Sequence, residues 1–392
     1  MKWVNADNRI PIKSWCEDVE SGAMEQAVNL ANHPTTFHHI ALMPDCHQGY
    51  GMPIGGVIAC DGAVIPNAVG VDIGCGMVAA KTDMLFEDID TKTLEAVIAG
   101  LKEHIPVGFS HHEEPQQWNG FLDAPDIPVI QQELESSRRQ IGTLGGGNHF
   151  IEIQAGSDGR VWLMLHSGSR NFGYKIAQEY NRRAMDLCAR WHSALPPGKG
   201  EDSLPFLPIG LRDGREYIEA MNFALRFARA NRDMMMSVVE RKFGKRTGAE
   251  VLERINIHHN FAAIEKHFGR WVWVHRKGAT QARDGQMGII PGSMGTSSYI
   301  VRGLGNKESF ESCSHGAGRS AGRAEFCRTH TVEECDEAMD GIIFGGWGRN
   351  RKGDPDISEA PGAYKNIDDV IASESDLVEV VVKLRPLGVM KG

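Results

Sequence analysis

Cysteine, aspartate and histidine side chains of the kind that bind transition metals lie in glycine-rich turns of this sequence. Asp72 and Cys75 are three residues apart in Asp72-Ile73-Gly74-Cys75-Gly76. A thiolate can bridge two metal ions, and a carboxylate suits the harder side of such a pair. Two ions held ~3.5–4 Å apart stabilise in-line displacement at phosphorus. Taken alone, such a pair is more often a buried cysteine beside a turn-forming aspartate.

Histidines in similar turns extend this pattern. His149 opens a predicted strand that carries Glu152, and His166 ends a predicted apolar strand. Such positions direct a ring toward the loops, where sites are usually built. His258 and His259 follow a stretch that we expect to be helical, and only one of them need be a ligand. Each ring alone equally fits a structural role, and the ligand types allow zinc, manganese, iron or cobalt.

His315 has a different setting, in Ser314-His315-Gly316-Ala317-Gly318-Arg319. Glycines let backbone N–H groups approach an anion, and Arg319 could add a bidentate phosphate contact. A neutral imidazole there could attack phosphorus and form a covalent intermediate. The alternative is a glycine-rich turn with a bystander histidine. The segment 291–299 is a second candidate phosphate cradle, or a plain turn. Four basic residues could hold a polyanion or be solvated charges: Arg170, Arg276, Lys277 and Arg283.

Composition excludes some classes of protein. The chain has 392 residues and a net charge of -9, whereas a nonspecific polyanion binder is more often basic. The 8 cysteines form no CxxC pair, and the first seven residues contain no apolar run. We therefore expect no secretory leader, reduced thiols and a cytoplasmic location. No stretch approaches the ~20 apolar residues of a membrane span.

Apolar runs and glycine clusters predict an α/β (α+β) chain with a β-rich centre, surrounding helices and functional loops. The main predicted strands are 38–43, 56–60, 77–82, 149–154, 160–166, 271–275, 297–301 and 377–384. The predicted helices are 92–104, 129–141, 174–192 and 215–243. We expect a single domain over 1–392, with surface excursions near 105–128 and 195–214.

Several long motifs together resemble the RtcB family of RNA ligases, over nearly the whole chain. They are Pro44-Asp45-Cys46-His47-Gln48-Gly49, Gly70-Val71-Asp72-Ile73-Gly74-Cys75-Gly76, Gly145-Gly146-Gly147-Asn148-His149-Phe150-Ile151-Glu152, His166-Ser167-Gly168-Ser169-Arg170, His259-Asn260, His275-Arg276-Lys277-Gly278-Ala279, Pro291-Gly292-Ser293-Met294-Gly295, Ser314-His315-Gly316-Ala317-Gly318-Arg319 and Gly388-Val389-Met390-Lys391-Gly392.

The resemblance implies an RtcB-like fold, GTP and two Mn²⁺ ions bridged by Cys75. Asp72 and His149 would complete one ion, and His166 and His259 the other. His315 would attack the α-phosphate of GTP to give a guanylyl-histidine. The guanylate would pass to an RNA 3′-phosphate, which a 5′-hydroxyl then attacks as GMP leaves. Ends with a 2′,3′-cyclic phosphate would first be opened to the 3′-phosphate.

The resemblance also implies the guanylate contacts, with Tyr364 as a plausible stacking partner of guanine. They are Asn148, His149, Phe150, Ile151, Glu152, His259, Asn260, Pro291, Gly292, Ser293, Met294, Ser298, His315, Gly316, Ala317, Gly318, Tyr364 and Lys391.

One departure follows Arg319, where Ser320-Ala321-Gly322-Arg323 replaces the Met-Ser-Arg stretch usual in the family. Because the metal and guanylylation motifs are intact, we interpret it as divergence in RNA choice, in a paralogue that acts in RNA repair or tRNA splicing-type reactions. Two alternatives stay open at this point. One is a guanylyltransferase that caps 3′-phosphate ends without sealing, and the other is a metal-stabilised RNA-binding protein with a decayed site. The expected partners are RNA and an archease-type activator, with no membrane.

Overall fold

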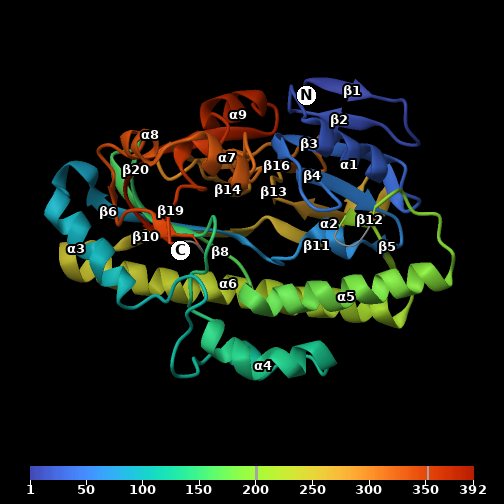
Figure 1. The fold of residues 1–392 in the computed structure, drawn as a ribbon, viewed down its shortest axis with the longest axis horizontal. Coiled ribbons are helices and arrows are strands. Elements are labelled where there is room, and N and C mark those ends of the chain that lie inside the picture. Colours follow the sequence, from blue (N-terminus) through green and yellow to red (C-terminus); the bar gives the residue numbers. More distant parts are fainter. Residues whose placement is uncertain (199–201, 351–352) are drawn as a thin grey trace.

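Two β-sheets form the centre of the protein in a computed structural model that describes residues 1–198, 202–350 and 353–392 (Figure 1). The first sheet has the strand order β1 (Trp3–Asn5), β2 (Ile12–Ser14), β3 (Thr36–His47), β4 (Ile54–Cys60), β12 (Arg270–Lys277) and β11 (Asn260–His267). Neighbouring strands in this sheet pair antiparallel, except β2 and β3, which are parallel. Antiparallel strands can be joined by short connections, whereas a parallel pair needs a longer crossover.

The second sheet carries most of the predicted site residues. Its order is β10 (Val251–His258), β6 (Gly76–Leu85), β8 (Arg160–Ser167), β7 (Phe150–Gly156), β20 (Val378–Lys391), β15 (Ser298–Gly303) and β14 (Met287–Ile290), with β17 (Ile343–Phe344) beside β20. Three ribbons complete the strands: β13 (Ala279–Gln281) with β16 (Ser312–Ser314), β18 (Gly348–Arg349) with β19 (Pro355–Asp356), and β5 (Ala63–Val64) with β9 (Leu207–Pro208).

Helices surround the sheets. They are α1 (Ser21–Ala31), α2 (Pro66–Val69), α3 (Thr91–Lys102), α4 (Pro128–Gln140), α5 (Arg170–Arg190), α6 (Arg212–Thr247), α7 (Arg323–Thr329), α8 (Val332–Glu337) and α9 (Ile367–Ser373). Short 3₁₀ turns are η1 (Phe86–Asp88), η2 (Asn119–Phe121), η4 (Lys307–Ser309) and η5 (Pro361–Ala363). Helices α5 and α6 lie side by side below the sheets, and α4 packs outside α5 (Figure 1).

The core between α6 and the second sheet follows from sequence periodicity. Met235, Val239 and Phe243 recur every four residues on one face of α6. They pack against Leu163 and Leu165 of β8, whose alternate residues face this side. Trp162 and Met164 face the opposite side and join a separate core. Strand β8 is therefore apolar throughout because both of its faces are covered.

The predicted α/β architecture with a β-rich centre is confirmed. One local expectation is wrong, since the stretch before His259 is strand β10 and not a helix. Helix α6 ends at Gly248, whose φ of 80° suits a glycine cap. Beyond it, Ile255 and Ile257 alternate with more exposed residues while β10 pairs with β6.

The two predicted excursions have little regular structure. Residues 105–128 consist of turns around η2, and residues 195–214 include β9 and the start of α6, apart from 199–201, which lie outside the described residues. No described helix combines the length and apolar character that a bilayer crossing requires.

Candidate metal centre and nucleotide pocket

Four predicted metal ligands meet because they lie at the ends of four adjacent strands. Cys75 precedes β6, His166 lies near the end of β8, and His149 precedes β7. The pairing places Gly76 opposite Ser167 and Phe150 opposite His166. On the other side of β6, His258 pairs with Gly76, and the His259 N–H donates to the Cys75 carbonyl at 2.9 Å. One edge of the second sheet thus gathers groups that are far apart in the sequence.

The five predicted ligands form a continuous series with Cys75 at its middle. Asp72 Oδ2 lies 3.4 Å from His149 Nε2, which lies 3.5 Å from Cys75 Sγ. On the other side, Cys75 Sγ lies 3.3 Å from His166 Nε2, which lies 3.3 Å from His259 Nε2. Cys75 therefore lies between two pairs of side chains, Asp72–His149 on one side and His166–His259 on the other.

The hydrogen bonds behind the rings direct lone pairs toward one point. His149 Nδ1 lies 2.9 Å from the Leu144 carbonyl oxygen, and His166 Nδ1 lies 3.0 Å from the Asn148 carbonyl oxygen. A carbonyl can only accept, so each Nδ1 carries the proton and each Nε2 presents a lone pair. Two imidazole lone pairs beside a cysteine sulfur and a carboxylate repel one another unless a cation lies among them. The donor set therefore fits a transition metal.

The protonation states agree with this interpretation. Burial lowers the pKa of both His166 and His259 well below the usual range, so both rings are neutral ligands. Burial would raise the pKa of Asp72, but the hydrogen bond and charge of His149 lower it to about 2. Burial and the Asp72 charge raise the pKa of Cys75 well above its ordinary value. A thiolate at Cys75 would therefore need a bound cation.

The two consecutive histidines face different neighbours. His258 Nδ1 lies 3.0 Å from Arg232 Nη2 and 3.1 Å from the Gly74 carbonyl oxygen. His259 instead faces His166, and its ring centroid lies 4.8 Å from that of His315. The structure thus brings His259 to the cluster and turns His258 away from it.

His315 is held by a buried carboxylate from the first sheet. Asp45 Oδ2 lies 2.6 Å from His315 Nδ1 and accepts the backbone N–H of His315 at 3.1 Å. Burial would raise the pKa of Asp45, but the His315 charge and hydrogen bonds lower it. An ionised carboxylate accepts, so Nδ1 is protonated, and the neutral form of the ring then has its lone pair on Nε2. That state is the one a nucleophilic imidazole needs.

Two further contacts fix the loop around His315. The Ser314 N–H donates to Glu374 Oε2 at 2.9 Å, and burial raises the pKa of Glu374 to about 8. Gly318 has φ 72°, and a Cβ at this position would collide with the Asp45 carbonyl. Only glycine allows the loop to pack this closely against β3.

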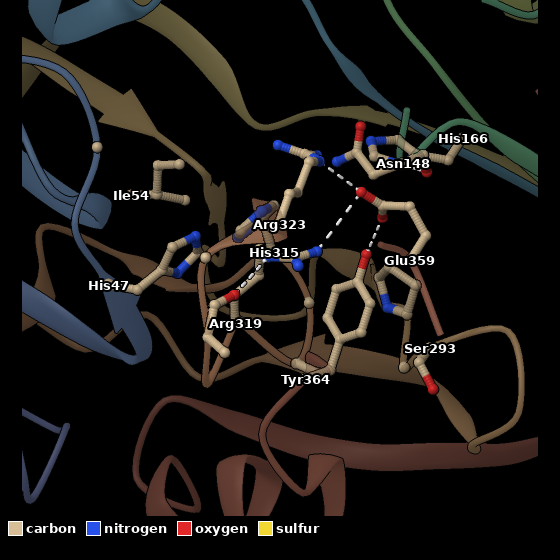
Figure 2. Close-up of a pocket in the computed structure, with 18 of the residues that line it drawn as sticks. His47, Ile54, Asn148, His166, Ser293, His315, Arg319, Arg323, Glu359 and Tyr364 are labelled. Atoms are coloured by element: carbon tan, nitrogen blue, oxygen red, sulfur yellow. Dashed lines mark hydrogen bonds and ion pairs between the residues drawn. The ribbon is translucent and has the colours of Figure 1, made fainter. Parts of the chain in front are cut away.

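A cavity of about 590 Å³ opens beside His315 (Figure 2). Twelve of the predicted nucleotide contacts line it: Asn148, Phe150, Pro291, Gly292, Ser293, Met294, His315, Gly316, Ala317, Gly318, Tyr364 and Lys391. His166 also lines the wall, so the cavity reaches the metal ligands. The volume suits a small organic ligand, and the glycine-rich segments present backbone groups to it.

Other predicted contacts lie behind this wall. Ile151 packs in the core beneath β7. Gln154 Nε2 donates to Glu152 Oε2 at 2.6 Å and to Ser298 Oγ at 3.2 Å, and Ser298 Oγ accepts the Gly292 N–H at 3.1 Å. Burial raises the pKa of Glu152 to about 8. These groups support the cradle at 291–294, and their contact with a nucleotide stays a prediction.

Both polar atoms of the Asn260 side-chain amide form hydrogen bonds with the backbone. Its Nδ2 donates to the Asp72 carbonyl at 3.1 Å, and its Oδ1 accepts the Gly278 N–H at 2.8 Å. It therefore ties the Asp72 turn to the β12–β13 connection. Its contact with guanylate also stays a prediction.

The suggested polyanion contacts have other partners. Arg276 is fully buried and pairs with Glu265 at 2.6 Å, so the expectation that it could hold a polyanion is wrong. Arg170 donates to Thr143 Oγ1 at 3.0 Å and to the Gly108 carbonyl at 2.6 Å. Arg283 lies 3.7 Å from Glu311.

Sequence reasoning from single motifs missed two carboxylates. Asp45 lies among buried residues near the end of β3, which is an unusual place for an aspartate and was the available signal. Glu359 lines the cavity with four polar partners that no local spacing could reveal.

Comparison with known proteins agrees with this geometry. The family model described as tRNA-splicing ligase RtcB matches residues 26–124 and 111–392. The chain is 40% identical to the RNA-splicing ligase RtcB of Escherichia coli (strain K12), over 97% of both chains. It is 33% identical to the RNA-splicing ligase RtcB of Mycobacterium tuberculosis (strain H37Rv), over 94% of this chain and 100% of that protein. The tRNA-splicing ligase RtcB of Pyrobaculum aerophilum is 31% identical over 98% of this chain and 95% of its own.

A cluster of side chains that fits a metal ion, beside a cavity lined by a histidine, is the kind of arrangement that phosphoryl transfer uses. The chain belongs to the RtcB family.

Proposed function

We propose that the protein is an RNA ligase that joins 3′-phosphate or 2′,3′-cyclic phosphate ends to 5′-hydroxyl ends, using GTP and manganese. The observation that carries the proposal is the setting of His315. Its Nδ1 is fixed by Asp45, it lines the cavity, and its ring lies beside His259 of the metal cluster.

The residues divide into two sets of metal ligands that share Cys75. Asp72 and His149 would hold one ion, and His166 and His259 the other, as the series of distances suggests. Two bound ions would neutralise charge on the attacked phosphate and lower the pKa of a bound hydroxyl.

The chemistry begins at His315 Nε2. Its lone pair attacks the α-phosphorus of GTP, and a P–N bond forms as the bond to pyrophosphate breaks. An oxygen of the RNA 3′-phosphate then attacks the guanylate phosphorus, which breaks the P–N bond and regenerates His315. Finally, the 5′-hydroxyl oxygen attacks the activated RNA phosphorus, its proton passes to solvent, and GMP leaves. A cyclic phosphate first takes up water to give the 3′-phosphate.

Asp45 stabilises the positive charge that develops on the imidazole when Nε2 bonds to phosphorus. It accepts from Nδ1 before and after the attack, so the ring does not need to reorient. The glycine-rich segments at 291–295 and 316–318 line the same cavity and would bind the phosphates through backbone N–H groups.

The cellular setting follows from the same chemistry. All 8 cysteines are free and only Cys327 is exposed, which suits a reducing compartment. We place the reaction in the cytoplasm, in tRNA splicing-type joining or RNA repair, with an archease-type protein as a candidate activator. We infer a single ligase domain because one site draws on residues from Asp45 to Lys391.

Defined RNA ends test the proposal. One strand carries a 3′-phosphate and the other a 5′-hydroxyl, and both are incubated with protein, GTP and Mn²⁺. We expect a sealed product that depends on both GTP and Mn²⁺ and is lost in His315→Ala. A guanylate-capped strand without sealed product would favour the capping alternative. RNA binding without either product would indicate a decayed site and contradict the proposal.

A further inference from the structure

One buried carboxylate, that of Glu359, joins four side chains at the cavity wall (Figure 2). Glu359 Oε1 accepts from Arg323 Nε at 2.7 Å and from Arg319 Nη1 at 3.5 Å. Glu359 Oε2 accepts the Tyr364 hydroxyl and lies 3.8 Å from Lys391 Nζ. Each oxygen thus serves two partners, and the residue is only 7% exposed.

These partners come from three segments that are far apart in the sequence. Arg319 and Arg323 lie after the His315 loop, Tyr364 follows η5, and Lys391 ends β20. Burial would raise the pKa of Glu359, but the charges of Lys391 and Arg323 lower it. The carboxylate is therefore ionised and offsets three cations that would otherwise repel one another.

Arg319 lies over the face of Tyr364 and lines the same cavity. Its Nε donates to the Ala321 carbonyl at 3.0 Å, and its Nη2 donates to the Ser358 carbonyl at 2.9 Å. Its guanidinium lies over the Tyr364 ring, 5.1 Å from the centroid. Three of its five N–H groups are thus engaged at the cavity wall, and the phosphate contact expected from the sequence stays a prediction. The ring is fixed through its face by Arg319 and through its hydroxyl by Glu359.

We propose that Glu359 is a positioning residue for the nucleotide base, because it fixes the Tyr364 ring and the Lys391 ammonium before the nucleotide binds. This inference rests on the proposed function, since it takes GTP as the occupant of the cavity. When side chains already have the arrangement that they adopt in the complex, less free energy is lost in ordering them on binding. Glu359 therefore sets the affinity for GTP, while the rate of attack by His315 depends on other residues.

Single-turnover guanylylation with labelled GTP and Mn²⁺, measured across GTP concentrations, tests the inference. We expect Glu359→Gln to raise the half-saturating GTP concentration about tenfold, while the maximal rate stays within about threefold. Tyr364→Phe removes only the hydroxyl and should raise the half-saturating GTP concentration by a smaller factor. The double variant should match Glu359→Gln alone, because the hydroxyl acts through this carboxylate.

The control is Glu333→Gln, which removes one charge from an exposed position of α8 that does not line the cavity. It should change half-saturation by less than about twofold, as expected for an exposed surface charge. An unchanged half-saturation in Glu359→Gln, or a loss confined to the maximal rate, would overturn the inference and leave the proposed function intact. If Glu359→Gln does not fold, an unchanged half-saturating GTP concentration in Tyr364→Phe would overturn the inference. Absence of guanylate labelling in the wild-type protein would overturn both this inference and the proposed function.

Discussion

Asp45 and His315, separated by 270 positions, are joined twice. Asp45 Oδ2 lies 2.6 Å from Nδ1 of the ring and 3.1 Å from the backbone nitrogen. The first contact selects the tautomer with a lone pair on Nε2, and the second fixes the position of the ring. This pair links the first sheet to the nucleotide cavity, and we regard it as the element that prepares His315 for attack.

Asp45→Asn is expected to reduce the maximal rate of guanylylation by about 10²- to 10⁴-fold. An amide can donate to Nδ1, which places the ring proton on Nε2 and removes the nucleophilic lone pair. Single-turnover labelling at saturating GTP measures the effect, and circular dichroism checks that the variant is folded. A rate within a few-fold of wild type would mean that Asp45 has no part in activating His315.

Cys75→Ala should remove both metal ions, because Cys75 lies between the Asp72–His149 and His166–His259 pairs. His259→Ala should retain one ion, since Asp72, Cys75 and His149 remain. Metal content after incubation with Mn²⁺ and gel filtration, measured by mass spectrometry of the metal, distinguishes these outcomes. Retention of two ions by Cys75→Ala would exclude the bridging arrangement.

His258 and His259 form a matched pair for testing the site. His259→Ala should abolish guanylylation, whereas His258→Ala should keep most of it and lose about 1–3 kcal/mol of stability. The reason is that His258 contacts Arg232 and the Gly74 carbonyl, and not the cluster. Labelling assays and urea unfolding of both variants measure the two effects. The reverse ranking in the labelling assay would show that the ligand assignment is wrong.

The buried pair Glu265–Arg276 predicts a pH dependence of stability. Burial would raise the pKa of Glu265, but the charge of Arg276 and the contact with His267 lower it to about 2. A lowered pKa means that this carboxylate stabilises the fold above its ordinary value of 4.5, and that the contribution is lost as pH falls from 4.5 toward 2. Its full size is about 3 kcal/mol.

Glu265→Gln should therefore lower stability at neutral pH by about 3–5 kcal/mol, because it leaves the Arg276 charge buried and unpaired. Between pH 4.5 and 2 the variant should lose less further stability than wild type. Urea unfolding at several pH values provides the measurement. Parallel pH profiles for the two proteins would argue against this pairing as the source of the acid sensitivity.

Local sequence singled out most of the side chains that converge in the cluster, and the family resemblance completed the predicted ligand set. Asp72, Cys75 and His149 lie in glycine-rich turns, and His166 ends a strand with an unmistakable apolar run, so their side chains could be assigned to a loop layer. The long periodic elements, such as α6 and β8, were predicted for the same reason. Their signals depend on residues that are close in sequence.

Features set by distant pairing could not be predicted in this way. Residues 249–254 contain alanine, leucine, glutamate and arginine, which favour helices, yet pairing with β6 makes β10 a strand. Nothing near Asp45 indicates that it meets His315, since β3 and the loop after β16 come together only in the folded chain. The same holds for Arg319, whose partners Ser358 and Glu359 are not indicated by its own motif.

The most direct test of the central claim is the intact mass of the protein after incubation with GTP and Mn²⁺. The account predicts a gain of one guanylate that is stable to alkali, lost in acid, located on His315 and absent from His315→Ala. A protein whose mass is unchanged, or a guanylate that still forms on His315→Ala, would contradict it.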